Sequence, residues 1–200
     1  MESEKLIIFL RHGQSQGNVA NILSSVKDTN PLTETGIAQA KTASKSIGAL
    51  PKVDMVYTSP VLRTVQTAAI ATSGLNVQSV VDDRLGERGM GSLEGMAVPN
   101  VPNEEWKFDP AYGLENWDSL KSRMLSFMND AKGSIILAVS HGDPISAACD
   151  IMDLKGERFH VLSCPGNCHF SIIDFAKKKI IATDTASIPT ELIVRPSGHP

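Results

Sequence analysis

The stretch KLIIFLRHGQSQGN, residues 5–18, joins a buried-strand pattern to a group of cationic and small polar side chains. Its first half is a run of aliphatic and aromatic residues, which is typical of a strand inside a core. The run stops at Arg11 and His12, and Gly13 follows at once. A strand that leads from the core straight into two cations predicts a polar site at its carboxyl end.

Length and charge narrow the class of protein. A chain of 200 residues fits one domain of ordinary size, and we expect a single domain over residues 1–200. Apolar residues make up 42% of the chain, enough to build a core. The net charge of −3 predicts no nucleic-acid partner and no membrane partner. Any anionic ligand must therefore be bound by a local cluster of cations.

Cysteine usage and hydropathy indicate the compartment. Cys149, Cys164 and Cys168 are an odd number and form no disulfide framework, which suits a reducing environment. The apolar run at residues 6–10 is too short for a signal peptide, and no run approaches 18 residues. We expect a cytoplasmic protein.

Strand patterns alternate with helical periodicity along the chain. The predicted strands are residues 5–10, 53–58, 77–81, 134–140, 170–175 and 179–183, and the predicted helices are residues 34–48, 60–73, 115–131 and 144–152. This alternation predicts an α/β sandwich with a mainly parallel sheet. The last two strands are too close for a crossover, so we expect a hairpin. The proline-bearing residues 89–113 predict a long loop or a small cap over one edge.

Two dipeptides predict where helices begin. Ser59-Pro60 and Asp143-Pro144 each place a side chain able to cap a helix before a proline, and each follows a predicted strand closely.

Polar side chains gather where the predicted strands end. Ligands of open parallel sheets bind beyond these ends, so the residues there should share one edge. The residues at or just after these ends are Arg11, His12, Ser59, Arg63, Glu87 and His141.

Two histidines, two arginines and one acid suit a phosphoryl group. Neutral imidazole is abundant near pH 7 and needs no activating base, so a histidine can be the nucleophile. Phosphoryl transfer mostly needs alignment and neutralisation of the equatorial oxygens, which Arg11, Arg63 and His141 can supply. Such a scheme requires no metal. Gly13 is expected to let backbone and phosphate approach closely.

Each of these residues also has an ordinary interpretation. Taken alone, Arg11 and His12 could be ordinary exposed residues at a strand end, and Arg63 could be a solvated residue of a helix. His141 could be a polar residue with its hydrogen bonds made locally, and Glu87 could be an ordinary surface acid. Their shared position at strand ends favours function. A rival zinc site would use His160, Cys164, Cys168 and His169, but Cys-x3-Cys-His does not match the usual spacings, and the intervening Pro-Gly-Asn is typical of a turn.

Five segments, in one order, resemble the motifs of a known family. LRHGQSQGN resembles R-H-G-x-[ST]-x-x-N, and PLTETGIAQA resembles L-T-x-x-G-x-x-Q-A. YTSPVLRTVQTA resembles S-x-x-x-R-[TA]-x-x-T-A, LGERGMGSLEG resembles L-x-E-x-x-x-G-x-x-E-G, and VSHG resembles a second histidine motif. The combination resembles the histidine phosphatase superfamily, in its phosphoglycerate-mutase-like branch. The resemblance implies a three-layer α/β sandwich, with a mostly parallel mixed sheet and helices on both faces.

The resemblance also implies roles for single residues. His12 becomes phosphohistidine, and Glu87 is the general acid for the leaving oxygen. The remaining predicted phosphate- or substrate-binding residues are Arg11, Asn18, Arg63, Arg88, His141 and Gly142. Two positions that are often aromatic in the family are Gly17 and Leu93 here. Neither change removes a reacting group.

The family contains hydrolases and isomerases. A phosphoglycerate mutase must hold a carboxylate and a second phosphate, and the typical mutase has a lysine where this chain has Val98. Arg88 is the one extra cation placed well. We therefore expect a metal-independent phosphatase without a cofactor, acting on small-molecule phosphate monoesters through an entrance lined partly by Met90, Leu93, Met96 and Trp106.

Two other functions stay open at this point. A mutase dependent on 2,3-bisphosphoglycerate would use that compound as its phosphoryl primer. A catalytically silent phosphate-binding module would keep the fold without turnover, but the intact set of reacting residues speaks against it.

Overall fold

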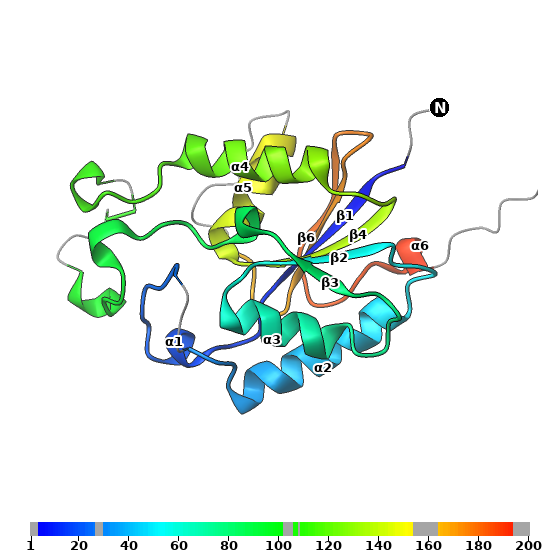
Figure 1. Cartoon of the computed structure of the whole chain (residues 1–200), viewed down its shortest axis with the longest axis horizontal. Helices are drawn as coiled ribbons and strands as arrows, with labels where there is room; N and C mark the ends of the chain where they lie inside the picture. The colour runs from blue at the N-terminus through cyan, green and yellow to red at the C-terminus, as the bar shows by residue number, and fades with distance from the viewer. Residues whose placement is uncertain (1–3, 27–29, 102–105, 108, 154–163, 194–200) are drawn as a thin grey trace, which may run out of the picture.

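The chain forms a six-stranded mixed sheet with helices on both faces (Figure 1). The computed structural model describes residues 4–26, 30–101, 106–107, 109–153 and 164–193. The predicted three-layer α/β sandwich is confirmed, with α2 and α3 on one side of the sheet and α4 and α5 on the other (Figure 1).

The sheet has the strand order β3-β2-β4-β1-β5-β6. Neighbours among β1 to β4 are parallel, whereas β5 runs antiparallel to β1, and β5 and β6 form the predicted hairpin. The strands are β1 (Leu6–Arg11), β2 (Met55–Thr58), β3 (Ser79–Val81), β4 (Ile135–Ser140), β5 (Phe170–Asp174) and β6 (Lys179–Thr185).

All four predicted helices are present. They are α2 (Glu34–Gly48), α3 (Leu62–Ala71), α4 (Trp117–Asp130) and α5 (Gly142–Met152). The sequence patterns did not predict the short helices α1 (Gln16–Val19) and α6 (Thr190–Ile193). A capping box between Ser15 and Asn18 starts α1, so side-chain hydrogen bonds, not hydrophobic periodicity, define this helix.

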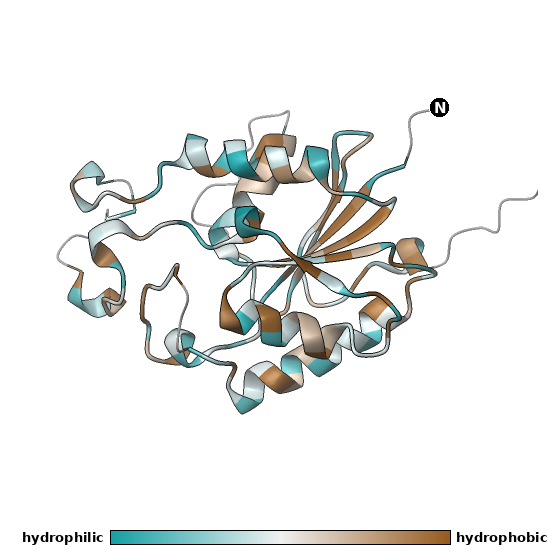
Figure 2. Ribbon diagram, in the orientation of Figure 1, coloured by the Kyte–Doolittle hydropathy of each residue, from teal (hydrophilic) through white to brown (hydrophobic). Residues whose placement is uncertain are grey.

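Strand β1 is buried on both faces. Leu6, Ile8 and Leu10 pack with the α2–α3 layer, and Ile7 and Phe9 pack with the α4–α5 layer. Full burial of each such side chain stabilises the fold by about 1.5–3 kcal/mol. Figure 2 shows the apolar residues concentrated in the strands at the centre of the molecule. This core fixes the strand that carries Arg11 and His12 to the edge of the sheet.

Residues 89–113 include three 3-10 turns in the described part, η2 (Gly91–Leu93), η3 (Val98–Asn100) and η4 (Pro110–Tyr112). Leu23, Met90 and Leu93 form a small apolar cluster with partly buried neighbours that include Met96 and Trp106. Four of these five side chains were expected at an apolar entrance. Leu93 is only 1% exposed, so it belongs to the interior of this segment. Within the described part of the chain, no helix is long and apolar enough to cross a bilayer.

The two predicted helix starts are wrong in detail. Helix α3 begins at Leu62 with Val61 as its N-cap. The Ser59 hydroxyl accepts the Val61 N–H at 3.3 Å, just before the helix, and a hydrogen bond from the His141 ring at 2.9 Å. Helix α5 begins at Gly142 with His141 as its N-cap. In both cases the start differs from the predicted one by two residues, and the side chain of the N-cap residue does not cap the helix.

Candidate active site

Three parallel strands bring the predicted site residues to one edge of the sheet. Arg11 of β1 pairs with Ser140 of β4, and Thr58 of β2 pairs with Val139 of β4. The residues that follow, His12, Ser59 and His141, therefore lie side by side. The backbone N–H of His12 donates to the Ser140 carbonyl at 3.0 Å, so the hydrogen bonds between β1 and β4 continue to the last residue of β4.

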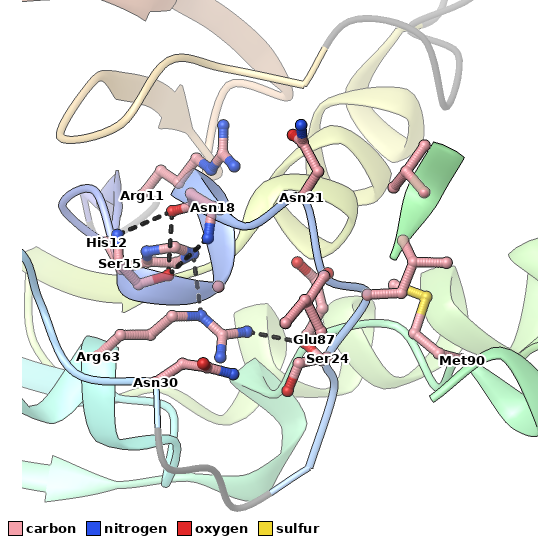
Figure 3. A pocket seen from close by; sticks show the side chains of 14 residues that line it. Arg11, His12, Ser15, Asn18, Asn21, Ser24, Asn30, Arg63, Glu87 and Met90 are labelled. Carbon is pink, nitrogen blue, oxygen red and sulfur yellow. Dashed lines mark hydrogen bonds between the residues drawn. The ribbon is translucent and has the colours of Figure 1, made fainter. Parts of the chain in front are cut away.

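A cavity of about 200 Å³ lies at this edge (Figure 3). Five of the predicted residues line it, namely Arg11, His12, Asn18, Arg63 and Glu87. They come from the end of β1, from α1, from α3 and from the segment after η1 (Asp83–Leu85). Residues far apart in the sequence thus meet in one polar hollow.

The His12 ring is neutral, and the structure fixes its tautomer. Its Nδ1 lies 2.7 Å from the Gly13 carbonyl, and Nε of Arg63 donates to its Nε2 at 3.1 Å. Because a guanidinium can only donate, Nε2 is the acceptor and Nδ1 carries the proton. Burial, followed by the charges of Arg63 and Arg11, holds the pKa of His12 well below its usual value. His12 therefore keeps Nε2 unprotonated, as a nucleophile needs, and the Arg63 hydrogen bond to Nε2 must break when this nitrogen attacks.

Arg63 connects the two histidines. One of its Nη2 hydrogens reaches Nδ1 of His141 at 3.0 Å, and Nη2 also donates to the Ser24 carbonyl at 3.0 Å. Nε2 of His141 donates to the Ser59 hydroxyl. Burial and the Arg63 charge hold the pKa of His141 well below its usual value. A guanidinium held on several sides is a rigid donor for a phosphoryl group.

Arg11 has one buried N–H group without a partner among the described residues, at Nε. Its Nη1 donates to the Pro165 carbonyl at 2.5 Å. A Cβ on Gly142 would lie 3.9 Å from this Nε and only 2.1 Å from the Cys164 sulfur, so a larger residue there would displace the Cys164 side chain. A buried charged donor is unfavourable without an acceptor, and an anion bound in the cavity could accept this hydrogen bond.

Glu87 has the properties of a proton donor near neutral pH. Its Oε1 accepts the Arg88 backbone N–H at 2.9 Å, and its Oε2 lies 4.0 Å from Nδ1 of His141. Burial, followed by the negative charge of Asp143, raises the pKa of Glu87 to about 7. Near pH 7 a large fraction of Glu87 therefore carries a proton that it can give away.

Arg88 is placed differently from the other predicted residues. Its guanidinium donates to the backbone carbonyls of Glu115 at 2.7 Å and Lys107 at 3.0 Å, and Nη1 lies 3.8 Å from Asp143. Among the described residues that line the cavity, Arg88 is not present. Its contact with substrate stays a prediction, and the geometry favours a role in holding residues 107 and 115 against the site.

Close packing explains why position 13 is a glycine, in addition to the predicted approach of a phosphate. A Cβ on Gly13 would lie 2.6 Å from the Gly36 carbonyl oxygen, so the loop after β1 packs directly on α2. The Gly13 N–H donates to the Thr67 hydroxyl at 3.0 Å. These contacts hold the backbone next to His12.

Three buried hydroxyl residues support the site through contacts that the sequence did not predict. Ser59 contacts His141, Thr67 contacts Gly13, and Ser15 donates twice to the side chain of Asn18. Each occupies a fixed hydroxyl position of the motifs quoted above. That pattern was the available signal, but the partner of each hydroxyl becomes visible only in the fold.

The rival zinc hypothesis gains no support. Among the described residues, no three histidine, cysteine or acidic side chains are arranged to hold a metal. His160 lies outside the described residues. Burial raises the pKa of Cys164 to about 11 and of Cys168 to about 12, so both are protonated thiols. Nδ1 of His169 contacts Asp184 at 2.6 Å.

Comparison with known proteins places the chain in a family. The model of the histidine phosphatase superfamily (branch 1) matches residues 7–185, and the chain belongs to this family. A 2,3-bisphosphoglycerate-dependent phosphoglycerate mutase of Thermoplasma acidophilum is 32% identical over 92% of this chain and 94% of its own. A candidate phosphoserine phosphatase of Hydrogenobacter thermophilus is 30% identical over 72% of this chain and 76% of its own.

The fold is shared with solved structures. A candidate α-ribazole-5'-P phosphatase from Escherichia coli superposes with a TM-score of 0.78 at 21% identity, covering 92% of this chain and 98% of its own. This identity shows a common architecture. The predicted family and fold are confirmed.

Replacement of Arg63 with lysine should lower kcat/KM by about 30- to 1,000-fold, the effect of removing about 2–4 kcal/mol of preorganised donor stabilisation. Lysine keeps the charge but loses the planar fork that reaches both histidines and Ser24 at once. Steady-state kinetics on a nitrophenyl phosphate measures the loss. Arg84→Lys, a change in a partly exposed arginine that pairs with Asp82 and Asp130, is the matched control. Equal kinetics for wild type and Arg63→Lys would place Arg63 outside the transition state.

Proposed function

We propose that the protein hydrolyses small-molecule phosphate monoesters through a phosphohistidine formed on His12. The observation that carries the proposal is the unprotonated Nε2 of His12, held by Arg63 in a cavity that Glu87 also lines. The nucleophile His12, the cation Arg63 and the acid Glu87 thus line the same cavity. The free cysteines suit action in the cytoplasm.

In the first half-reaction the Nε–H of Arg63 moves its hydrogen bond from Nε2 of His12 to a phosphoryl oxygen, and the freed lone pair of Nε2 forms a bond to phosphorus. The bond between phosphorus and the ester oxygen breaks, and Glu87 gives its proton to that departing oxygen. Arg11 and Arg63 neutralise charge on the equatorial oxygens. His141, whose ring is neutral, contributes a hydrogen bond and no charge, and the side chain of Asn18 and the backbone of Gly142 add polar contacts.

The second half-reaction uses water. The ionised Glu87 takes a proton from water while the water oxygen attacks phosphorus. The bond from phosphorus to Nε2 breaks, and inorganic phosphate leaves. Histidine and glutamic acid return to their starting protonation states, so the cycle balances.

Removal of metal ions should leave the reaction unchanged. The described residues around the cavity supply cations to the phosphoryl group, whereas a metal site would need carboxylates and neutral ligands. After dialysis against a strong chelator, we expect kcat/KM to stay within about twofold of the untreated enzyme. A large loss that zinc or magnesium restores would contradict the proposal.

The mutase is the second candidate, and the relative from Thermoplasma acidophilum favours it. A mutase needs cations for a carboxylate and a second phosphate in addition to those for the transferred group. Of the described residues that line the cavity, only Arg11 and Arg63 are permanently charged cations, and Val98 is an apolar part of the lining. This composition favours hydrolysis of monoesters.

Two assays separate the candidates. A chromogenic phosphate ester and a panel of small alkyl phosphates should release inorganic phosphate. A coupled assay for conversion of 3- to 2-phosphoglycerate, with and without 2,3-bisphosphoglycerate, should show no primer-dependent turnover above phosphate release. Primer-dependent isomerisation that exceeds hydrolysis would establish the mutase. An absence of turnover in both assays would favour a silent phosphate-binding module.

A further inference from the structure

Residues 164–169, which we call the CPGNCH turn, contact the phosphoryl site from the antiparallel side of the sheet. Nη1 of Arg11 donates to the Pro165 carbonyl, and the Arg11 backbone N–H donates to the His169 carbonyl at 3.1 Å. The Cys168 N–H lies 3.1 and 3.2 Å from the carbonyls of Arg11 and His12. These contacts do not involve a metal, and they connect the turn to the backbone on both sides of the nucleophile.

Asn167 is the side chain of this turn that hydrogen-bonds to the loop of His12 and to Asn18. Its Nδ2 donates to the His12 carbonyl at 3.1 Å and to Oδ1 of Asn18 at 3.3 Å. One amide therefore bridges the nucleophile's backbone and a residue of the cavity lining. No other side chain among the described residues has hydrogen bonds to both of these groups.

The donors around Asn18 determine which way its amide faces. Its Oδ1 accepts from the Ser15 N–H at 3.0 Å, from the Ser15 hydroxyl at 3.2 Å and from Asn167. Since the oxygen is held on this side, Nδ2 of Asn18 faces away from these three donors, and Asn18 lines the cavity (Figure 3). The Ser15 contacts lie within one local turn, whereas Asn167 ties that turn to His12.

Asp184 of β6 anchors the CPGNCH turn in its place. Its Oδ1 accepts from the Gly166 N–H at 2.7 Å and lies 2.6 Å from Nδ1 of His169. The turn is thus held on one side by β6 and on the other by the loop after β1. An element fixed at both ends can hold Asn167 in one position.

We propose that Asn167 is a positioning residue of the phosphoryl site. It sets the distance between the Asn18 amide and His12, so that Nδ2 of Asn18 can donate to a phosphoryl oxygen while Nε2 of His12 faces phosphorus. The proposal rests on the proposed function to the extent that the cavity takes a phosphoryl group. Asn167 itself touches no reacting atom.

A double-mutant cycle with Asn18 tests this. Affinity for inorganic phosphate, measured by calorimetry, should fall about tenfold in Asn167→Ala, the equivalent of one lost hydrogen bond to a charged group. In an Asn18→Ala background the same change should cost less than about twofold, because its effect acts through Asn18. Full additivity of the two losses, or phosphate affinity unchanged in Asn167→Ala, would overturn the proposal. So would a wild type that does not bind phosphate.

Two further variants separate positioning from folding. Asn167→Asp keeps the shape but sets a carboxylate oxygen against the His12 and Asn18 oxygens, so phosphate affinity should fall at least as far as in Asn167→Ala. Asn116→Asp is the matched control, because its side chain caps α4 as an acceptor and aspartate accepts equally well. If Asn167→Ala lowers the melting temperature alone and leaves phosphate affinity intact, the residue is merely structural.

The binding cycle does not depend on turnover. If the wild type bound phosphate but hydrolysed no ester, the proposed function would fail while the cycle still decided the role of Asn167. If it hydrolysed esters and the cycle were additive, only the role of Asn167 would fail.

Discussion

Replacement of His12 with alanine is expected to lower kcat/KM for every phosphate ester by about 10⁵-fold or more, the scale on which removal of a catalytic nucleophile acts. The reason is geometric. Nε2 of His12 is the unprotonated nitrogen at the cavity, and Arg63 fixes its direction. Incubation with ³²P-labelled ester should give a phosphoenzyme in the wild type that is labile in acid and stable in base. His12→Ala should carry no label.

A variant that keeps the nucleophile is the control for this experiment. His141→Ala retains His12 and should still acquire the acid-labile label, but slowly, because it loses the ring that holds Arg63 in place. Label that survives in His12→Ala, or that resists acid, would place the covalent chemistry on another side chain.

The strand-end residues could be predicted because they depend on a local rule. Arg11 and His141 follow runs of apolar residues, and parallel strands end at one edge, so the sequence alone brought them together. The register confirms this, with the ends of β1 and β4 paired. The same rule does not give orientations. Arg88 follows Glu87 directly, yet its guanidinium binds the carbonyls of Glu115 and Lys107.

The supporting residues could not be predicted from local patterns. Asn167 and His12 are separated by 155 positions, and only the antiparallel pairing of β5 with β1 brings them together. Ser59 precedes a proline and its hydroxyl accepts the Val61 N–H as a cap would, but its bond to His141 has no local signal. Side-chain hydrogen bonds between distant segments depend on the complete fold, because no sequence periodicity encodes them.

Replacement of Glu87 with glutamine should slow hydrolysis of alkyl phosphates by about 10²–10⁴-fold, the usual contribution of general acid catalysis. A departing alkoxide is a strong base and needs a proton as the bond breaks. A departing nitrophenolate is stable and needs little help. The burst of nitrophenolate, which reports phosphorylation of His12 alone, should therefore change by less than about tenfold. Equal losses for the two esters would reject the acid role.

The pH profile gives an independent measure of the same proton. With a pKa of about 7, Glu87 loses its proton as the pH rises through 7, so wild-type kcat/KM for alkyl phosphates should fall above that pH. The pKa of His12 lies well below the usual histidine value of 6.5, so the nucleophile stays neutral as the pH falls through 6.5. No acid limb should therefore appear near that pH. Glu87→Gln should lack the alkaline limb, because glutamine does not titrate. An alkaline limb that persists in this variant would belong to another group.

The pH dependence of the melting temperature distinguishes a proton-donating Glu87 from a Glu87 that only forms a structural ion pair. Burial and Asp143 raise the pKa of Glu87 from its ordinary value of 4.5 to about 7, so the folded protein binds a proton that the unfolded chain releases. That contribution is fully present below pH 4.5 and is lost as the pH rises through 7. Relative to wild type, the melting temperature of Glu87→Gln should therefore increase between pH 5 and pH 8. A carboxylate held in an ion pair has a lowered pKa and would give the opposite trend, so a relative melting temperature that falls over this interval would remove the basis for Glu87 as the proton donor.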